Sequence, residues 1–141
     1  MGKREERQRT IRNLVRRERI RTQRDLAERL KELQYECTQA TVSRDITEMG
    51  LLKSGQGYYA LPEDMILERV LNDMVLTIED AGNLLVVKTS SGGAAVLGEA
   101  IDNTDIEGLV GSVAGDNTIL IVAKTPEYAK KIGNMFKNMR K

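Results

Sequence analysis

Hydrophobic residues recur every three or four positions in the first third of the chain, which is the spacing of one helix face. This spacing predicts one helix over residues 3–18 and a second that begins after Thr22. The inward positions of both helices are aliphatic: Ile11, Leu14, Val15, Leu26, Leu30 and Leu33. Thr22 can cap the second helix, with the acidic Asp25 three positions on. The chain therefore opens with two amphipathic helices.

A third predicted helix is capped at its start by Thr38 and has two chemically different faces. One face is an apolar stripe formed by Val42, Ile46 and Met49. The opposite face carries small side chains and one guanidinium: Ala40, Ser43, Arg44 and Thr47. Only residues 34–37 separate this helix from the second, so the pair predicts a helix-turn-helix whose last helix enters a DNA major groove.

The flanking segments complete a winged helix-turn-helix. Residues 51–53 and 58–61 surround a Ser-Gly-Gln-Gly turn and predict a hairpin, in which Lys53 is a candidate DNA contact. The outer side of the first helix carries a basic stripe that could lie along a phosphate backbone: Arg9, Arg12, Arg16 and Arg19. We therefore expect residues 1–61 to form a DNA-binding domain.

Charge supports this interpretation more than any single motif does. Residues 1–60 contain fourteen Lys and Arg against nine Asp and Glu, a net charge of +5, whereas the remainder contains eight against twelve, a net charge of −4. Short capped helix pairs also occur in proteins that never bind DNA, and charged runs are usually solvated faces. The combination of motif and charge asymmetry favours double-stranded DNA as a partner of the first part only.

From about residue 70 the hydrophobic pattern alternates, which predicts strands. The predicted elements are a hairpin of strands over 70–79 and 84–89, a helix over 91–101 with Ser91 as its cap, strands over 109–114 and 118–123, and a helix capped by Thr125. The fold class is therefore α+β, with a ββαββα domain over residues 70–141. Pro62 disfavours both helix and central strand, so residues 62–69 are expected to be a linker.

Residues 119–122 are apolar on both sides of their strand. Both faces of the sheet should therefore be covered, one by helices and the other, in so small a domain, by another subunit. Oligomerisation is accordingly assigned to residues 70–141.

The composition disfavours several other classes of protein. No apolar run approaches membrane-spanning length and no signal peptide is visible, so we expect a soluble cytoplasmic protein with no membrane partner. The single Cys37 excludes an internal disulfide. An enzyme that uses Asp102 and Asp116 as acid and base is a disfavoured rival, because the chain has no histidine and no phosphate-loop or zinc-ligand spacing. We expect neither a metal nor a cofactor.

Ligand chemistry in the second half is concentrated in Gly115-Asp-Asn117. The simpler interpretation is a tight turn, because these residue types tolerate positive φ. The alternative is that Asp116 binds a cationic effector, with three further acidic residues nearby in sequence: Asp102, Asp105 and Glu107.

Two motifs resemble those of the bacterial arginine repressors, and the resemblance extends over almost the whole chain. Thr38-Gln-Ala-Thr-Val-Ser-Arg-Asp-Ile46 resembles that family's recognition-helix motif, and Gly111-Ser-Val-Ala-Gly-Asp-Asn117 resembles its effector-loop motif. The resemblance implies a regulator that binds paired operator boxes, represses arginine biosynthesis and activates arginine catabolism. It further implies a hexamer of two trimers with L-arginine, the co-repressor, bound between them.

The resemblance also implies roles for individual residues. Ser43 and Arg44 match the DNA-reading pair, with Gln39 and Thr41 beside them. Asp102 and Asp116 match acidic effector contacts, and the loop around Asp116 adds three further candidates: Ala114, Gly115 and Asn117.

The sequence departs from the family pattern at two effector positions. Asn117 stands where the family has a second aspartate, which removes one formal charge and keeps an acceptor oxygen. Ala95 stands where relatives carry a polar side chain. Two alternatives therefore remain open: a regulator of this architecture that senses another amino acid, or a subunit that acts beside a paralogue.

Overall fold

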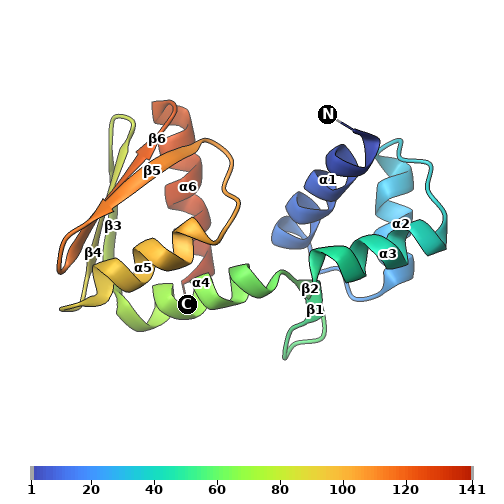
Figure 1. The fold of residues 1–141 in the computed structure, drawn as a ribbon, viewed down its shortest axis with the longest axis horizontal. Helices are drawn as coiled ribbons and strands as arrows, with labels where there is room; N and C mark the ends of the chain where they lie inside the picture. Colours follow the sequence, from blue (N-terminus) through green and yellow to red (C-terminus); the bar gives the residue numbers. More distant parts are fainter. Residues whose placement is uncertain (1, 141) are drawn as a thin grey trace. The chain divides into compact units, whose positions relative to one another are not determined.

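Two separate hydrophobic cores organise the chain. The computed structural model describes residues 2–140. They fall into two compact units that divide between Pro62 and Glu63 (Figure 1). Each unit has its own cluster of buried aliphatic residues. The boundary lies at the start of the expected linker.

The N-terminal unit is three helices followed by a short hairpin. Its elements are α1 (Lys3–Arg17), α2 (Gln23–Glu32), α3 (Gln39–Met49), β1 (Leu52–Lys53) and β2 (Tyr59–Ala60). Thr22 Oγ1 accepts from the Asp25 amide, and Thr38 Oγ1 accepts from the Thr41 amide. The helices, both predicted caps and the hairpin are thus confirmed. Leu33 is an exception: it follows the end of α2, where the chain turns, and is 41% exposed.

The C-terminal unit is an antiparallel sheet with helices. Its elements are α4 (Pro62–Met74), β3 (Val75–Ala81), β4 (Leu84–Thr89), α5 (Gly93–Asp102), β5 (Leu109–Ala114), β6 (Thr118–Ala123) and α6 (Pro126–Met139). The strand order in the sheet is β3-β4-β6-β5. The predicted ββαββα order follows α4, and the α+β class is confirmed.

The expected linker over residues 62–69 is helical, which corrects the expectation from Pro62. Proline occupies the first position of α4, where its missing N–H would have had no helical partner. Leu67 and Leu71 of this helix are fully buried in the C-terminal core. Helix α4 therefore continues through Met74, and the strand predicted to begin at residue 70 begins at Val75.

Helices cover one face of the sheet and leave the other exposed within the chain. The covered face carries Leu85, Val87, Ile119 and Ile121, which are at most 1% exposed. The opposite face includes Val113 and Leu120, which are paired across β5 and β6 and are 72% and 42% exposed. The prediction of one helix-covered face is confirmed. The cover of the other face stays a prediction. Within residues 2–140, no helix is long and apolar enough to span a membrane.

Candidate DNA interface and effector loop

Helix α3 presents the predicted polar stripe to solvent. Ser43, Arg44 and Thr47 are exposed, as are Gln39 and Ala40 at its start. Thr41 is half-buried, and its hydroxyl lies 3.0 Å from that of Thr38. Val42 is buried on the other side, with Ile46 and Met49 packed against the same core. The structure thus brings the predicted reading residues onto one open surface.

A buried carboxylate lies within α3. Asp45 is only 1% exposed, and Arg7 of α1 binds it with two nitrogens, Nε at 2.5 Å from Oδ2 and Nη2 at 2.9 Å from Oδ1. Gln8 Nε2 also donates to Oδ1 at 2.9 Å. These contacts join α1 to α3 next to Arg44. Sequence reasoning missed Asp45, although its place three residues after Val42 put it on the apolar stripe.

Burial and pairing act in opposite directions on Asp45. Burial raises the pKa of this carboxyl. The hydrogen bonds from Arg7 and Gln8 and the charge of Arg7 together lower it by more, so the net pKa is below its ordinary value. Glu48, one turn along α3, accepts from Gln8 at 2.9 Å and pairs with Arg4 at 2.7 Å. Both carboxylates of α3 are therefore neutralised from α1.

The predicted basic stripe on α1 is only partly open to solvent. Arg9 is exposed, and Arg12 and Arg16 are half-buried. At about 100° per residue, Arg9 lies about 200° around the helix from Arg7, which contacts α3. Arg9 therefore lies on the side of α1 away from α3, whereas Arg12 follows by one turn Gln8, which also contacts α3. The role of the stripe in DNA binding stays a prediction.

Two cations hold the wing hairpin through aromatic rings. The Lys53 ammonium lies 5.2 Å from the centroid of the Tyr59 ring and also donates to the Arg21 carbonyl. The Arg19 guanidinium lies 5.5 Å from the centroid of the Tyr58 ring. Lys53 and Arg19 thus belong to the wing and its support.

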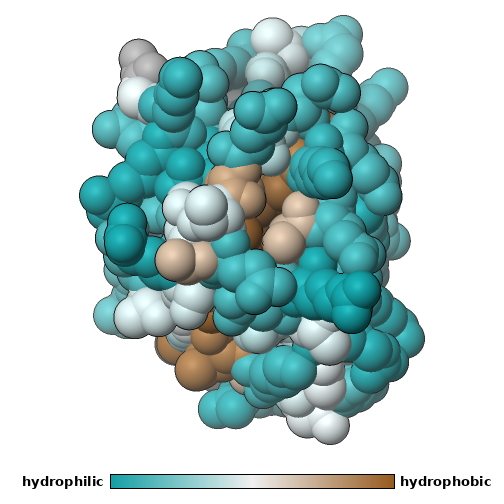
Figure 2. Space-filling view, turned by 90° about the vertical axis from the view of Figure 1, so that its right-hand side faces the viewer, coloured by the Kyte–Doolittle hydropathy of each residue, from teal (hydrophilic) through white to brown (hydrophobic). Residues whose placement is uncertain are grey.

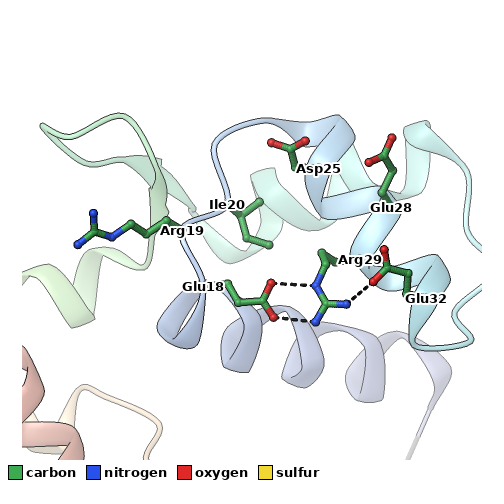
Figure 3. Close-up of a pocket in the computed structure, with 7 residues that line it drawn as sticks. All are labelled: Glu18, Arg19, Ile20, Asp25, Glu28, Arg29 and Glu32. Atoms are coloured by element: carbon green, nitrogen blue, oxygen red, sulfur yellow. Dashed lines mark hydrogen bonds and ion pairs between the residues drawn. The ribbon is translucent and has the colours of Figure 1, made fainter.

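A hollow in the N-terminal unit has the wrong charge for DNA. Figure 3 shows Arg29 between Glu18 and Glu32, with Asp25 and Glu28 also lining the hollow. Arg29 binds both oxygens of Glu18, at 2.8 and 2.7 Å, and its hydrogen bond lowers the pKa of Glu18. Figure 2 shows a surface of the N-terminal unit that is mostly hydrophilic, with hydrophobic colour in small areas. The exposed guanidinium and hydroxyl groups of α3 suit phosphate and bases better than the acidic side chains that line the hollow.

The loop between β5 and β6 is held by three backbone hydrogen bonds. Gly115 N donates to Thr118 O at 2.8 Å, Thr89 N to Asn117 O at 2.8 Å, and Ala94 N to Asp116 O at 3.3 Å. Ala114, Gly115, Asp116 and Asn117 are all exposed. None of residues 115–117 has a positive φ. These residues do form a tight turn between β5 and β6, but none of them adopts a left-handed backbone, so positive φ does not explain their residue types.

Asp116 and Asn117 are engaged differently. Ser91 Oγ donates to Asp116 Oδ2 at 3.1 Å, and the Asn117 amide oxygen accepts from the Thr118 hydroxyl at 3.2 Å. The prediction that Ser91 caps α5 is wrong, because the N-cap is Gly92 (φ 79°), which makes no side-chain cap bond. A serine two residues before the first helical residue can instead reach the neighbouring loop.

Helix α5 separates the two predicted acidic effector contacts. Ala95 is exposed in the first turn, beside the loop, whereas Asp102 is the exposed last residue of the helix. At 1.5 Å per residue, about 12 Å of helix separates Ala94, which contacts the loop, from Asp102. Glu107 accepts from the Tyr128 hydroxyl at 3.2 Å. One chain therefore does not bring Asp102 and Asp116 together. Among residues 2–140, no three or more Asp, Glu, Cys or His side chains lie together in a way that could hold a metal ion.

Comparisons with known proteins agree over both units. Residues 2–66 match the family described as arginine repressor, DNA binding domain, and residues 71–138 match arginine repressor, C-terminal domain. The chain is 43% identical to an arginine repressor of Thermus thermophilus, over 96% of this chain and 90% of that protein. It is 42% identical to one of Geobacillus thermodenitrificans and 43% identical to one of Halothermothrix orenii, each over 92% of this chain and 93% of that protein.

The buried pair on α3 predicts a specific acid sensitivity. The folded pKa of Asp45 is below the unfolded value of about 3.9. The contribution of ionised Asp45 to folding stability is therefore complete above the unfolded pKa. It is lost as the pH falls through the lowered pKa of the folded state. Asp45→Asn should cost about 3 to 5 kcal/mol at neutral pH, because Arg7 loses its charged partner, and should flatten the acid dependence.

Peptide-resolved hydrogen exchange of the full chain between pH 7 and pH 2.5 would measure this. Protection of α1 and α3 should fall on acidification in the native protein and depend less on pH in Asp45→Asn. Helix α6 serves as the internal control. The same acid dependence of α1 and α3 in both proteins would contradict the assignment.

Proposed function

This chain belongs to the arginine repressor family, and on that premise we propose that its C-terminal unit senses L-arginine through the Asp116 loop. The chain is a DNA-binding transcription repressor and not an enzyme. The observation that carries the proposal is an exposed, hydrogen-bonded Asp116 carboxylate on a backbone-anchored loop.

The chemistry of the carboxylate supports a guanidinium ligand. Its two acceptor oxygens match the paired N–H groups of a guanidinium, and such forked bonds combine strength with fixed orientation. The unit that carries the loop has a net negative charge, since residues 61–141 sum to −4. Arginine would act as a co-repressor ligand, and the site needs no prosthetic cofactor.

Assembly into a hexamer of two trimers completes the proposal. The exposed apolar sheet face around Val113 and Leu120 is a surface that another copy could cover. Asp102 lies at the end of α5 that is far from the Asp116 loop. This separation supports a ligand site between chains, where one copy supplies Asp116 and another can supply Asp102.

Helix α3 would read operator DNA in the cytoplasm. We assign base contacts to Ser43 and Arg44, with Gln39, Thr41 and Thr47 beside them, and backbone contacts to Arg9, Arg12, Arg16 and Lys53. The targets would be arginine biosynthesis genes, repressed when arginine is abundant, and arginine catabolism genes, activated by the same complex.

A second candidate is a regulator of this architecture that senses another amino acid or works beside a paralogue. The observation that favours it is Asn117, whose side chain is neutral and already accepts from Thr118. Gel-shift titration of the full chain on operator DNA, with L-arginine and with other amino acids, separates the two candidates. Operator binding that responds to another amino acid and not to arginine would favour the second.

Arg44→Ala tests the assignment of the reading helix. If the guanidinium forks onto guanine O6 and N7, its loss should reduce discrimination between operator and random DNA by about 1 to 3 kcal/mol. The matched variant is Arg9→Ala, because a lost phosphate contact should weaken both DNAs alike and reduce the salt slope by about 0.9. Competition gel shifts at several salt concentrations measure both effects. Unchanged discrimination in Arg44→Ala would remove it from the reader role.

Asp116→Ala and Asn117→Asp test the effector loop. Losing the carboxylate should weaken arginine binding by about 2 to 5 kcal/mol if the assembly desolvates the pair. Asn117→Asp should strengthen it, because hydrogen bonds to a charged acceptor are about twice as strong as neutral ones. Calorimetric titration with L-arginine, and with citrulline, whose urea side chain is uncharged, measures both changes in affinity. Equal binding of the two ligands, or full arginine binding by Asp116→Ala, refutes the guanidinium site.

Val113→Glu tests the assembly surface. A carboxylate on the open sheet face should be expensive to bury between copies, so the assembly should dissociate toward smaller species. Leu33→Glu is the control, since Leu33 is an exposed leucine of the N-terminal unit. Sedimentation equilibrium of the full chain at micromolar concentration gives the masses. Native mass retained by Val113→Glu, or a monomeric native protein, would count against this interface.

A further inference from the structure

The Asp116 carboxylate is held by a residue from outside its own loop. Ser91, which precedes α5, donates from Oγ to Oδ2 at 3.1 Å, although the two residues are 25 positions apart. The loop backbone is fixed independently by the bonds from Gly115, Thr89 and Ala94. Ser91 therefore acts on the remaining freedom of the Asp116 side chain, which is the rotation of its carboxylate.

The start of α5 gives this serine its geometry. Gly92 has a left-handed φ of 79° and no side chain to cap the helix, and the Asp116 carbonyl accepts from the Ala94 amide in its place. The first turn contains no acidic residue, so the positive end of the helix dipole faces the Asp116 segment without a competing carboxylate. Ser91 is thus placed to donate to the loop and not to cap the helix.

We propose that Ser91 is a positioning residue that orients the Asp116 carboxylate for a guanidinium and thereby sets selectivity for a charged over a neutral ligand. The inference rests on the proposed arginine-sensing function. A hydroxyl bond to one lone pair of Oδ2 leaves Oδ1 and a second lone pair of Oδ2 open to the ligand. Fixing the carboxylate plane before binding reduces the ordering cost that the ligand would otherwise meet.

Selectivity follows from the geometry of the fork. A guanidinium needs both carboxylate oxygens at a defined angle, whereas the urea group of citrulline forms weaker, neutral hydrogen bonds. A freely rotating carboxylate therefore loses more affinity for arginine than for citrulline. A role in folding alone would weaken both ligands by the same factor.

The test uses three variants of the full chain, titrated by calorimetry with L-arginine and with citrulline. Ser91→Ala should weaken arginine binding about threefold to tenfold, the range expected for one hydrogen bond, and change citrulline binding less than twofold. Ser91→Thr keeps the hydroxyl and should restore the native ratio. Ser90→Ala is the matched control, because the contacts of Ser90 with Met74 and Thr89 are made by its backbone.

Hydrogen exchange of the ligand-free proteins separates positioning from structural damage. Protection of α5 should be the same in Ser91→Ala and the native chain. An unchanged arginine-to-citrulline ratio in Ser91→Ala, or equal weakening of both ligands, overturns the role of Ser91. If Asp116→Ala still weakens arginine binding in that case, the proposed arginine-sensing function holds without a role for Ser91. A native protein that binds no arginine overturns both.

Discussion

The sheet of the C-terminal unit has two apolar faces and helices for only one, and this constraint shapes the rest of the structure. Leu85 and Ile121 are buried beneath helices, whereas Val113 and Leu120 face outward. Exposed apolar area costs about 25 cal/mol per Å², so the outer face favours association. The covered face determines where α5 lies, because Leu97 and Ile101 of that helix are buried in the same core as Ile119. The position of α5 in turn places its first turn against the Asp116 loop.

The N-terminal unit has an aliphatic core and adds to it a buried polar contact between two helices. Arg7 and Asp45 join α1 to α3, and removing one partner from such a buried pair costs about 3 to 5 kcal/mol. The pair also changes the charge that α3 presents to solvent. Asp45 is adjacent to Arg44 in sequence, and an unpaired carboxylate there would repel phosphate. Because Arg7 neutralises it, the open face of α3 keeps Arg44 as its charged group.

Local pattern was sufficient to predict most elements and most candidate residues. Helix spacing and the caps Thr22 and Thr38 predicted the three N-terminal helices, and alternation predicted four strands. The errors arose where distant packing decides the outcome. Pro62 was interpreted as a breaker, but the burial of Leu67 and Leu71 against the second core favours a helix that starts on that proline. Ser91 was interpreted as a cap because its partner lies 25 residues away, beyond any local signal.

The sequence by itself determined the order of the secondary-structure elements apart from α4, the two-unit division of charge and the polar stripe of α3. The elements and the stripe depend on residues a few positions apart, so the spacing of apolar and polar residues predicts them. The division of charge can be counted directly from the sequence. Only the tertiary structure decided which side chains meet: Arg7 with Asp45, Ser91 with Asp116, and Asp102 apart from Asp116. Such pairings are set by how helices and strands pack across the core, and no spacing along the chain encodes that distance.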